Sequence, residues 1–153
     1  MTAVYGVLKV VHVLSVVAWI GGATALGAVT AMLIRARDRA ALSALLPRAQ
    51  RYGQTVGGPS SILVLLTGGA MVGVARIPFT TLWVLWGLTG IVLHFVIAIG
   101  VLRKRGMRFA RAMATPGDDA ELAEAGRALR STNVLYLLIM ASVIVVMVLK
   151  PTL

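Results

Sequence analysis

The stretch VVHVLSVVAWIGGATALGAVTAMLI, from Val10 to Ile34, decides the fold of this chain. It runs for 25 residues without an Asp, Glu, Lys or Arg side chain. About 20 helical residues suffice to cross the ~30 Å hydrocarbon core of a bilayer. The apolar run is too long for a secretory signal, and no basic residue lies among the first eight. We therefore expect a transmembrane helix that stays in the mature protein.

Three further stretches are long and apolar enough to span a membrane. They lie within Val56–Ala75, over Leu82–Leu102 and over Asn133–Leu149. None alternates polar and apolar residues with a period of two, which excludes membrane strands. Hydrophobic residues make up 59% of the chain and the mean hydropathy is +0.92, which excludes an ordinary soluble domain. The sequence predicts an all-α, polytopic membrane protein, a single four-transmembrane-helix bundle over residues 1–153.

The start of the second span carries a Gly57-Gly58-Pro59 sequence. Proline lacks an N–H and crowds the preceding turn, so a helix there is expected to be kinked or to begin late. The basic loops, residues 35–55 and 103–132, are each expected to contain helix as well, over Ala40–Gln50 and Asp118–Arg130. Pro116-Gly117 is expected to break the chain before the second of these.

The basic residues predict the orientation. Twelve of the 15 Lys and Arg side chains fall in the two loops 35–55 and 103–132, and only Lys9, Arg76 and Lys150 fall elsewhere. Basic loops remain cytoplasmic, so both termini are expected on the extracytoplasmic side of the inner membrane. The same loops should attract anionic inner-leaflet lipids. Only Tyr52 and Phe109 are interleaved with the basic residues, which argues against nucleic acid as a partner.

Several kinds of chemistry are excluded. The chain has no cysteine, so disulfides and thiolate metal sites are absent. None of its five acidic residues lies in a span, which leaves no carboxylate pair for hydrolysis or proton relay. The glycine-rich segments are not followed by the lysine of a phosphate-binding loop.

His12 is the main candidate for function, because an imidazole inside a membrane is costly. Ser15 and Trp19 follow it on one helical face, and the small residues Gly21 and Gly22 come next. Such small residues ordinarily serve close helix packing. Close packing would also admit a flat macrocycle beside the backbone.

His94 is the second histidine, on one face of the third span with Trp83, Gly87 and Gly90. A haem held by both histidines would need them at one depth. His94 lies nine residues from Arg103 and His12 lies 23 residues from Arg35, so their depths should differ by about 10 Å or more. Bis-histidine ligation within one subunit is therefore disfavoured.

Depth places other residues with His12 in the outer third of the bundle: Lys9, Met71, Arg76, Met147 and Lys150. This set suits a haem with His12 as axial ligand and cations for the propionates. It equally suits copper, with His12, Met71 and Met147 as ligands. The remaining alternative is that the methionines fill a core and the lysines reach to the interface.

The segment Leu8–Leu14 followed by Val17–Gly22 resembles the first helix of an uncharacterised family of four-helix integral membrane proteins, the domain of unknown function 2269 type. The closing Val145–Pro151 and the Thr67-Gly68 pair are similar as well. The His…Trp-x-Gly-Gly helix also resembles copper-resistance D membrane proteins and, more distantly, four-helix haem-binding protoporphyrinogen oxidases. In those oxidases a first-helix histidine is associated with haem b, and His12 is the matching position.

Three hypotheses follow. The leading one is an integral membrane protein that binds b-type haem and acts in electron transfer or membrane oxidoreduction. Its cofactor-binding residues would be His12, Trp19, Gly22, Lys9, Arg76 and Lys150, with His94 as a further candidate. The second is a copper-handling permease or accessory protein, and the third is a structural or assembly module without cofactor. A homodimer is compatible with all three.

Overall fold

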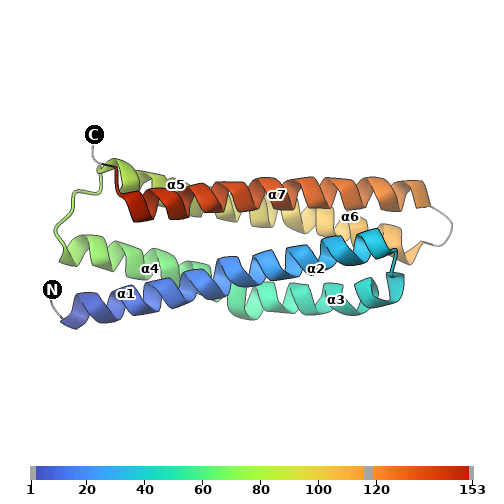
Figure 1. Cartoon of the computed structure of the whole chain (residues 1–153), viewed down its shortest axis with the longest axis horizontal. Coiled ribbons are helices and arrows are strands. Elements are labelled where there is room, and N and C mark those ends of the chain that lie inside the picture. Colours follow the sequence, from blue (N-terminus) through green and yellow to red (C-terminus); the bar gives the residue numbers. More distant parts are fainter. Residues whose placement is uncertain (1–2, 116–118, 152–153) are drawn as a thin grey trace.

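The computed structural model describes residues 3–115 and 119–151, and these residues form four long helices (Figure 1). The first comprises α1 (Ala3–Val16), a π-helical segment η1 (Val17–Gly21) and α2 (Gly22–Ala36). The second comprises α3 (Arg39–Tyr52), η2 (Gly53–Gly57) and α4 (Gly58–Val74). The third comprises α5 (Leu82–Phe95), η3 (Val96–Leu102) and α6 (Arg103–Ala114), and the fourth is α7 (Asp119–Leu149).

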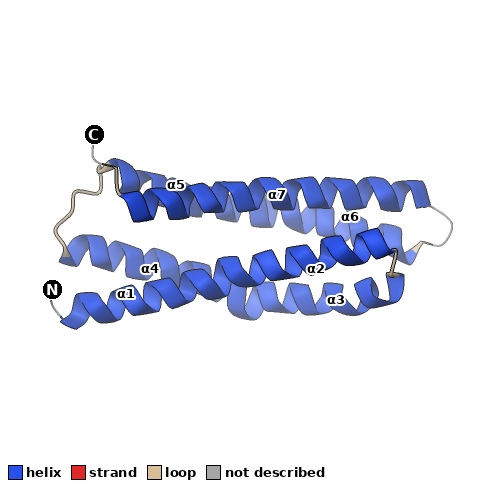
Figure 2. Cartoon of the chain, in the orientation of Figure 1, coloured by secondary structure: helices blue, strands red, loops and turns tan. Residues whose placement is uncertain are grey.

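The all-α class is confirmed, and the described residues form four long apolar helices consistent with a four-span membrane bundle. All four helices are long and apolar enough to cross a membrane, with 31 to 36 residues each. The described part of the chain contains helices and connections but no strand (Figure 2). A helix of 34 residues is about 50 Å long, which exceeds the ~30 Å hydrocarbon core. Each helix therefore extends well beyond the membrane.

The second helix does not begin late at Gly57-Gly58-Pro59. It runs unbroken from Arg39 to Val74, and the glycines lie where the π-helical segment η2 passes into α4. Proline at the second position of α4 has no N–H to donate into the preceding turn. A widened π turn accommodates that missing donor without ending the helix. The predicted helices in both basic loops are confirmed as continuations of the spans, and residues 116–118, which include Pro116-Gly117, lie outside the described residues.

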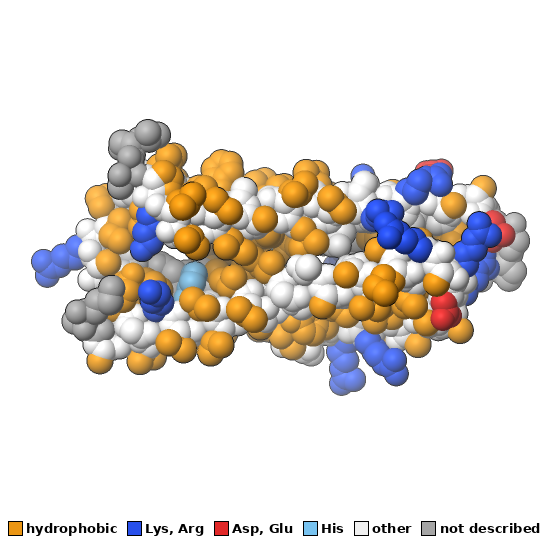
Figure 3. All heavy atoms as spheres, in the orientation of Figure 1, with side chains coloured by type: hydrophobic (Ala, Val, Ile, Leu, Met, Phe, Trp, Pro, Cys, Tyr) orange, Lys and Arg blue, Asp and Glu red, His pale blue; other side chains and the backbone are white. Residues whose placement is uncertain are grey.

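The helices form two hairpins that run side by side (Figure 1). In the first, α1 packs along α4 and α2 along α3, and in the second, α5 and α6 pack along α7. The beginning of α1 and the end of α7 lie together, and we call this the terminal end of the bundle. The opposite end carries the α2–α3 and α6–α7 connections and most of the Lys and Arg side chains (Figure 3), and we call it the basic end.

The two hairpins are held together mainly toward the basic end. There α2 contacts α7 and α3 contacts α6, and Phe109, Leu42, Ala112 and Ala125 form a buried cluster. An ion pair joins Arg39 to Asp119 across the hairpins. Toward the terminal end, among the described residues, the hairpins contact each other closely only through α4 and α5. The bundle is therefore more open between α1 and α7 at its terminal end.

Two glycines of α2 are positions of close approach. At Gly22 a Cβ atom would lie 1.9 Å from the hydroxyl of Tyr52, whose O–H donates to the Ala18 carbonyl. At Gly27 a Cβ atom would lie 2.2 Å from the side-chain nitrogen of Asn133 in α7. The small residues thus serve helix packing, as the sequence predicts. The space beside Gly22 in particular is occupied by the ring of Tyr52.

Candidate functional site

His12 projects from α1 toward α4 and is held there by a hydrogen bond. Its Nδ1 lies 3.0 Å from Oγ1 of Thr67. The Thr67 hydroxyl has one proton, and it donates that proton to the Leu63 carbonyl, 2.5 Å away. Toward His12 the hydroxyl can therefore only accept, so Nδ1 carries the imidazole proton.

This arrangement leaves Nε2 of His12 with a free lone pair. Metal-binding histidines commonly donate their second ring N–H to an oxygen acceptor, which fixes the tautomer and orients the ligating nitrogen. Thr67 supplies such an acceptor from the neighbouring helix. Gly68 follows it, and a Cβ atom there would lie 3.2 Å from Cε1 of His12. The absence of a side chain at Gly68 therefore lets the imidazole approach α4 closely.

The surroundings of His12 are partly open. His12 is half-buried, whereas His94 is buried, with 8% of its surface exposed. Figure 3 shows a histidine side chain beside a hollow between the two helix pairs, toward the terminal end. Lys9, one turn from His12 toward the chain terminus, is exposed. The imidazole is thus neither sealed in aliphatic packing nor directed away from the bundle.

His94 belongs to a different cluster, deeper in the bundle. Its Nδ1 lies 2.9 Å from the hydroxyl of Tyr136, and its ring packs edge-on against Trp19 with centroids 4.4 Å apart. Trp19 lies seven residues from His12 along the same helix, which is about 10 Å. His94 therefore lies about 10 Å closer to the basic end than His12, as the sequence predicts. The two imidazoles do not face each other.

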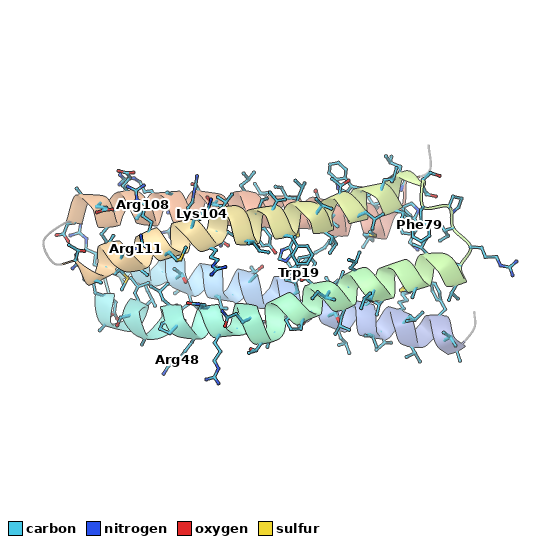
Figure 4. The ribbon with its side chains drawn as sticks, turned by 180° about the vertical axis from the view of Figure 1, so that it is seen from behind. Trp19, Arg48, Phe79, Lys104, Arg108 and Arg111 are labelled. Atoms are coloured by element: carbon cyan, nitrogen blue, oxygen red, sulfur yellow. The ribbon has the colours of Figure 1, made fainter. Side chains whose placement is uncertain are left out.

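Trp19 is the buried centre of this second cluster. Only 5% of its surface is exposed, and its side chain lies between the helix pairs (Figure 4). Its buried Nε1 has no hydrogen-bond partner within the described residues. Val64, Ile91 and Met140 complete the surrounding core. Trp19 is therefore placed with His94 rather than with His12.

Most of the remaining predicted site residues lie toward the terminal end, but their described contacts are with residues other than His12. Lys150 places its Nζ 5.3 Å from the centre of the Trp83 ring, and the methyl group of Met147 lies in the notch at Gly87. Gly87 is seven residues from His94 and thus at about the depth of His12. Met71 is one turn beyond Thr67 on α4 and is half-buried, and Arg76 is exposed in the connection after α4. Gly22 lies ten residues from His12, about 15 Å along the helix.

Sequence reasoning did not identify Thr67 and Tyr136 as the partners of the two histidines. Each carries a buried hydroxyl within an apolar span. A polar side chain in such a span was the one feature of the sequence that could have pointed to them. The pairing depends on helix contacts between positions 55 and 42 residues apart. No group of three or more His, Cys, Asp or Glu side chains that could hold a metal occurs within the described residues. A metal here would rely on a single histidine with softer or weaker ligands.

Comparison with known proteins now decides the family. Residues 6–151 match a family of predicted integral membrane proteins, DUF2269. The chain belongs to this family. The match covers nearly all of the four helices, so this DUF2269 chain is an integral, multi-pass membrane protein. No curated protein and no solved structure matches it.

Proposed function

We propose that this DUF2269 protein binds a b-type haem through Nε2 of His12 and serves in electron transfer or membrane oxidoreduction. The observation that carries the proposal is the hydrogen bond from His12 Nδ1–H to Thr67, because it leaves Nε2 as a free ligand in a partly open place. When bound, haem supplies one-electron chemistry. The protein's task is to hold and orient it.

The residues around His12 support this role. Thr67 fixes the ring of His12, and Gly68 brings α4 close to it. Lys9 and Lys150 lie nearer the terminal end and would offer positive charge to the propionates. Met147 lies at about the depth of His12 and is a candidate for the second axial ligand. We further propose that the terminal end faces outward and the basic end faces the cytoplasm, because basic loops resist translocation.

Substituting Thr67 by valine should weaken haem binding by about 10- to 100-fold, because second-sphere hydrogen bonds of metal-ligating histidines have effects of this size. Valine keeps the shape of threonine and removes its hydroxyl, which accepts from His12 and donates to the Leu63 carbonyl. The measurement is a hemin titration of the full-length protein in detergent, followed by the Soret band. The wild-type protein from haem-replete cells should show that band as isolated. A colourless wild-type protein that gains no band with hemin would refute the proposal.

A copper site is the second candidate, and the position of Met147 favours it. Its thioether lies at about the depth of His12, and imidazole and thioether are suitable ligands for Cu(I). A Met71→Leu/Met147→Leu double variant separates the two functions in one preparation. Loss of Cu(I) affinity with an unchanged Soret band would favour copper. Unchanged Cu(I) affinity would remove the copper site.

A further inference from the structure

The face of α7 at the basic end carries a shallow depression of about 350 Å³. Six residues line it, all from α7: Arg127, Arg130, Ser131, Val134, Leu135 and Leu138. We call this surface the α7 lipid face. Its two arginines and its serine lie toward the basic end, and its three apolar residues continue along the helix into the predicted span. Along the membrane normal, the polar part of this face thus lies nearer the basic end and the apolar part lies deeper in the span.

Arg130 lies at the depth of the lipid headgroups, and Arg127 lies about one turn farther out, from where its long side chain can reach back toward them. The apolar part of α7 begins at Asn133, so Arg130 and Arg127 lie about 5 and 9 Å before it. The headgroup layer on each side of the hydrocarbon core is about 5–7 Å thick. Leu135 and Leu138, with 56% and 63% of their surfaces exposed, lie beyond that layer in the region of the acyl chains.

Arg127 and Arg130 also have no carboxylate partner within the described residues. Asp119 pairs with Arg39, and Glu121 and Glu124 pair with Arg108. Asp38 accepts the N–H of Ala41 at the beginning of α3. The carboxylates that the structure describes are therefore engaged elsewhere, and the charge of the α7 lipid face is left for an external anion.

We propose that the α7 lipid face binds one anionic phospholipid, with the phosphate between Arg127 and Arg130 and an acyl chain along Val134, Leu135 and Leu138. Charge complementarity at one end and apolar surface at the other favour a lipid over a soluble anion. They also favour a lipid over a second copy of the chain, which would bring the same arginines against each other. Ser131 is on the same face, although its hydroxyl donates to the Ala128 carbonyl.

The test uses native mass spectrometry of the full-length protein with phosphatidylglycerol and phosphatidylcholine of identical acyl chains. The wild-type protein should retain one phosphatidylglycerol in preference to phosphatidylcholine. Each membrane-facing cation contributes about 1 kcal/mol, or roughly fivefold. An Arg127→Gln/Arg130→Gln variant should therefore lose affinity for phosphatidylglycerol by about 25-fold. All substituted side chains are exposed, so the fold should persist.

A matched control comes from the first hairpin. Arg48 and Arg51 are exposed at the same end, and Arg48 points away from the bundle (Figure 4). An Arg48→Gln/Arg51→Gln variant removes the same charge and should retain the lipid. If both double variants lost affinity for phosphatidylglycerol equally, the effect would reflect the net positive charge of the basic end rather than the α7 lipid face, and the proposal would be overturned. The proposal would also be overturned if the wild-type protein bound phosphatidylglycerol and phosphatidylcholine equally. A dimer that forms through the α7 lipid face and retains no lipid would overturn it as well.

Discussion

Replacing Gly22 by alanine should lower the free energy of unfolding by about 2–4 kcal/mol. A Cβ atom there would lie 1.9 Å from the Tyr52 hydroxyl and 2.3 Å from the ring carbon that bears it, so the ring has to move. Overpacking of this kind costs about 1–3 kcal/mol. Losing the hydrogen bond from Tyr52 to the Ala18 carbonyl costs about 1 kcal/mol more. Thermal unfolding in detergent measures the change.

Gly21 supplies the matched control. It is the neighbouring residue and is exposed, and a Cβ atom there would meet nothing within 4 Å. Gly21→Ala should therefore be neutral or stabilise the protein by up to about 1 kcal/mol, since alanine favours a helix over glycine. Shortening Tyr52 to leucine should recover part of the loss in the Gly22→Ala protein. Equal effects of the two alanine substitutions would show that Tyr52 does not pack at Gly22.

Replacing Trp19 by alanine should destabilise the protein by about 3–5 kcal/mol, because it leaves a large cavity in the core. Trp19 is buried against His94 and lies in the cluster with Val64 and Met140. Its removal exposes the polar groups of His94 and Tyr136 to that cavity. Chemical unfolding in detergent, followed by circular dichroism, is a suitable measurement.

Trp86 provides the comparison for Trp19. It lies on α5 with 42% of its surface exposed, so Trp86→Ala should change the free energy of unfolding by less than about 1 kcal/mol. A further variant, Trp19→Phe, keeps most of the packing and should keep the proposed haem spectrum, because Trp19 lies about 10 Å from His12 along the helix. A Trp19→Phe protein that folds but loses haem would instead place Trp19 in the cofactor site.

The spans were predictable because lipid imposes a simple rule on the sequence. An uncharged apolar run such as Val10–Ile34 has few alternatives to a transmembrane helix. The π-helical segments were not predictable, because they depend on how neighbouring helices pack. The Gly57-Gly58-Pro59 sequence indicated a kink or a late helix start, whereas the helix continues through it with a π-helical segment at that place.

The candidate site was predictable only in part. An imidazole within a span drew attention to His12, and helix geometry alone separated its depth from that of His94. The partners of both histidines lie on other helices, at Thr67 and Tyr136. A single sequence does not reveal which faces of two helices meet. The roles of Gly22 and Met147 in packing depend on the same contacts.

The most direct test of the account is a hemin titration that compares His12→Ala with His94→Ala. Both variants remove one imidazole from a span, and thermal unfolding would verify that each remains folded. The proposed role of Nε2 of His12 predicts that His12→Ala gains no Soret band, whereas His94→Ala binds hemin as the wild-type protein does. A full Soret band in His12→Ala, or its loss only in His94→Ala, would contradict the assignment of His12 as the haem ligand.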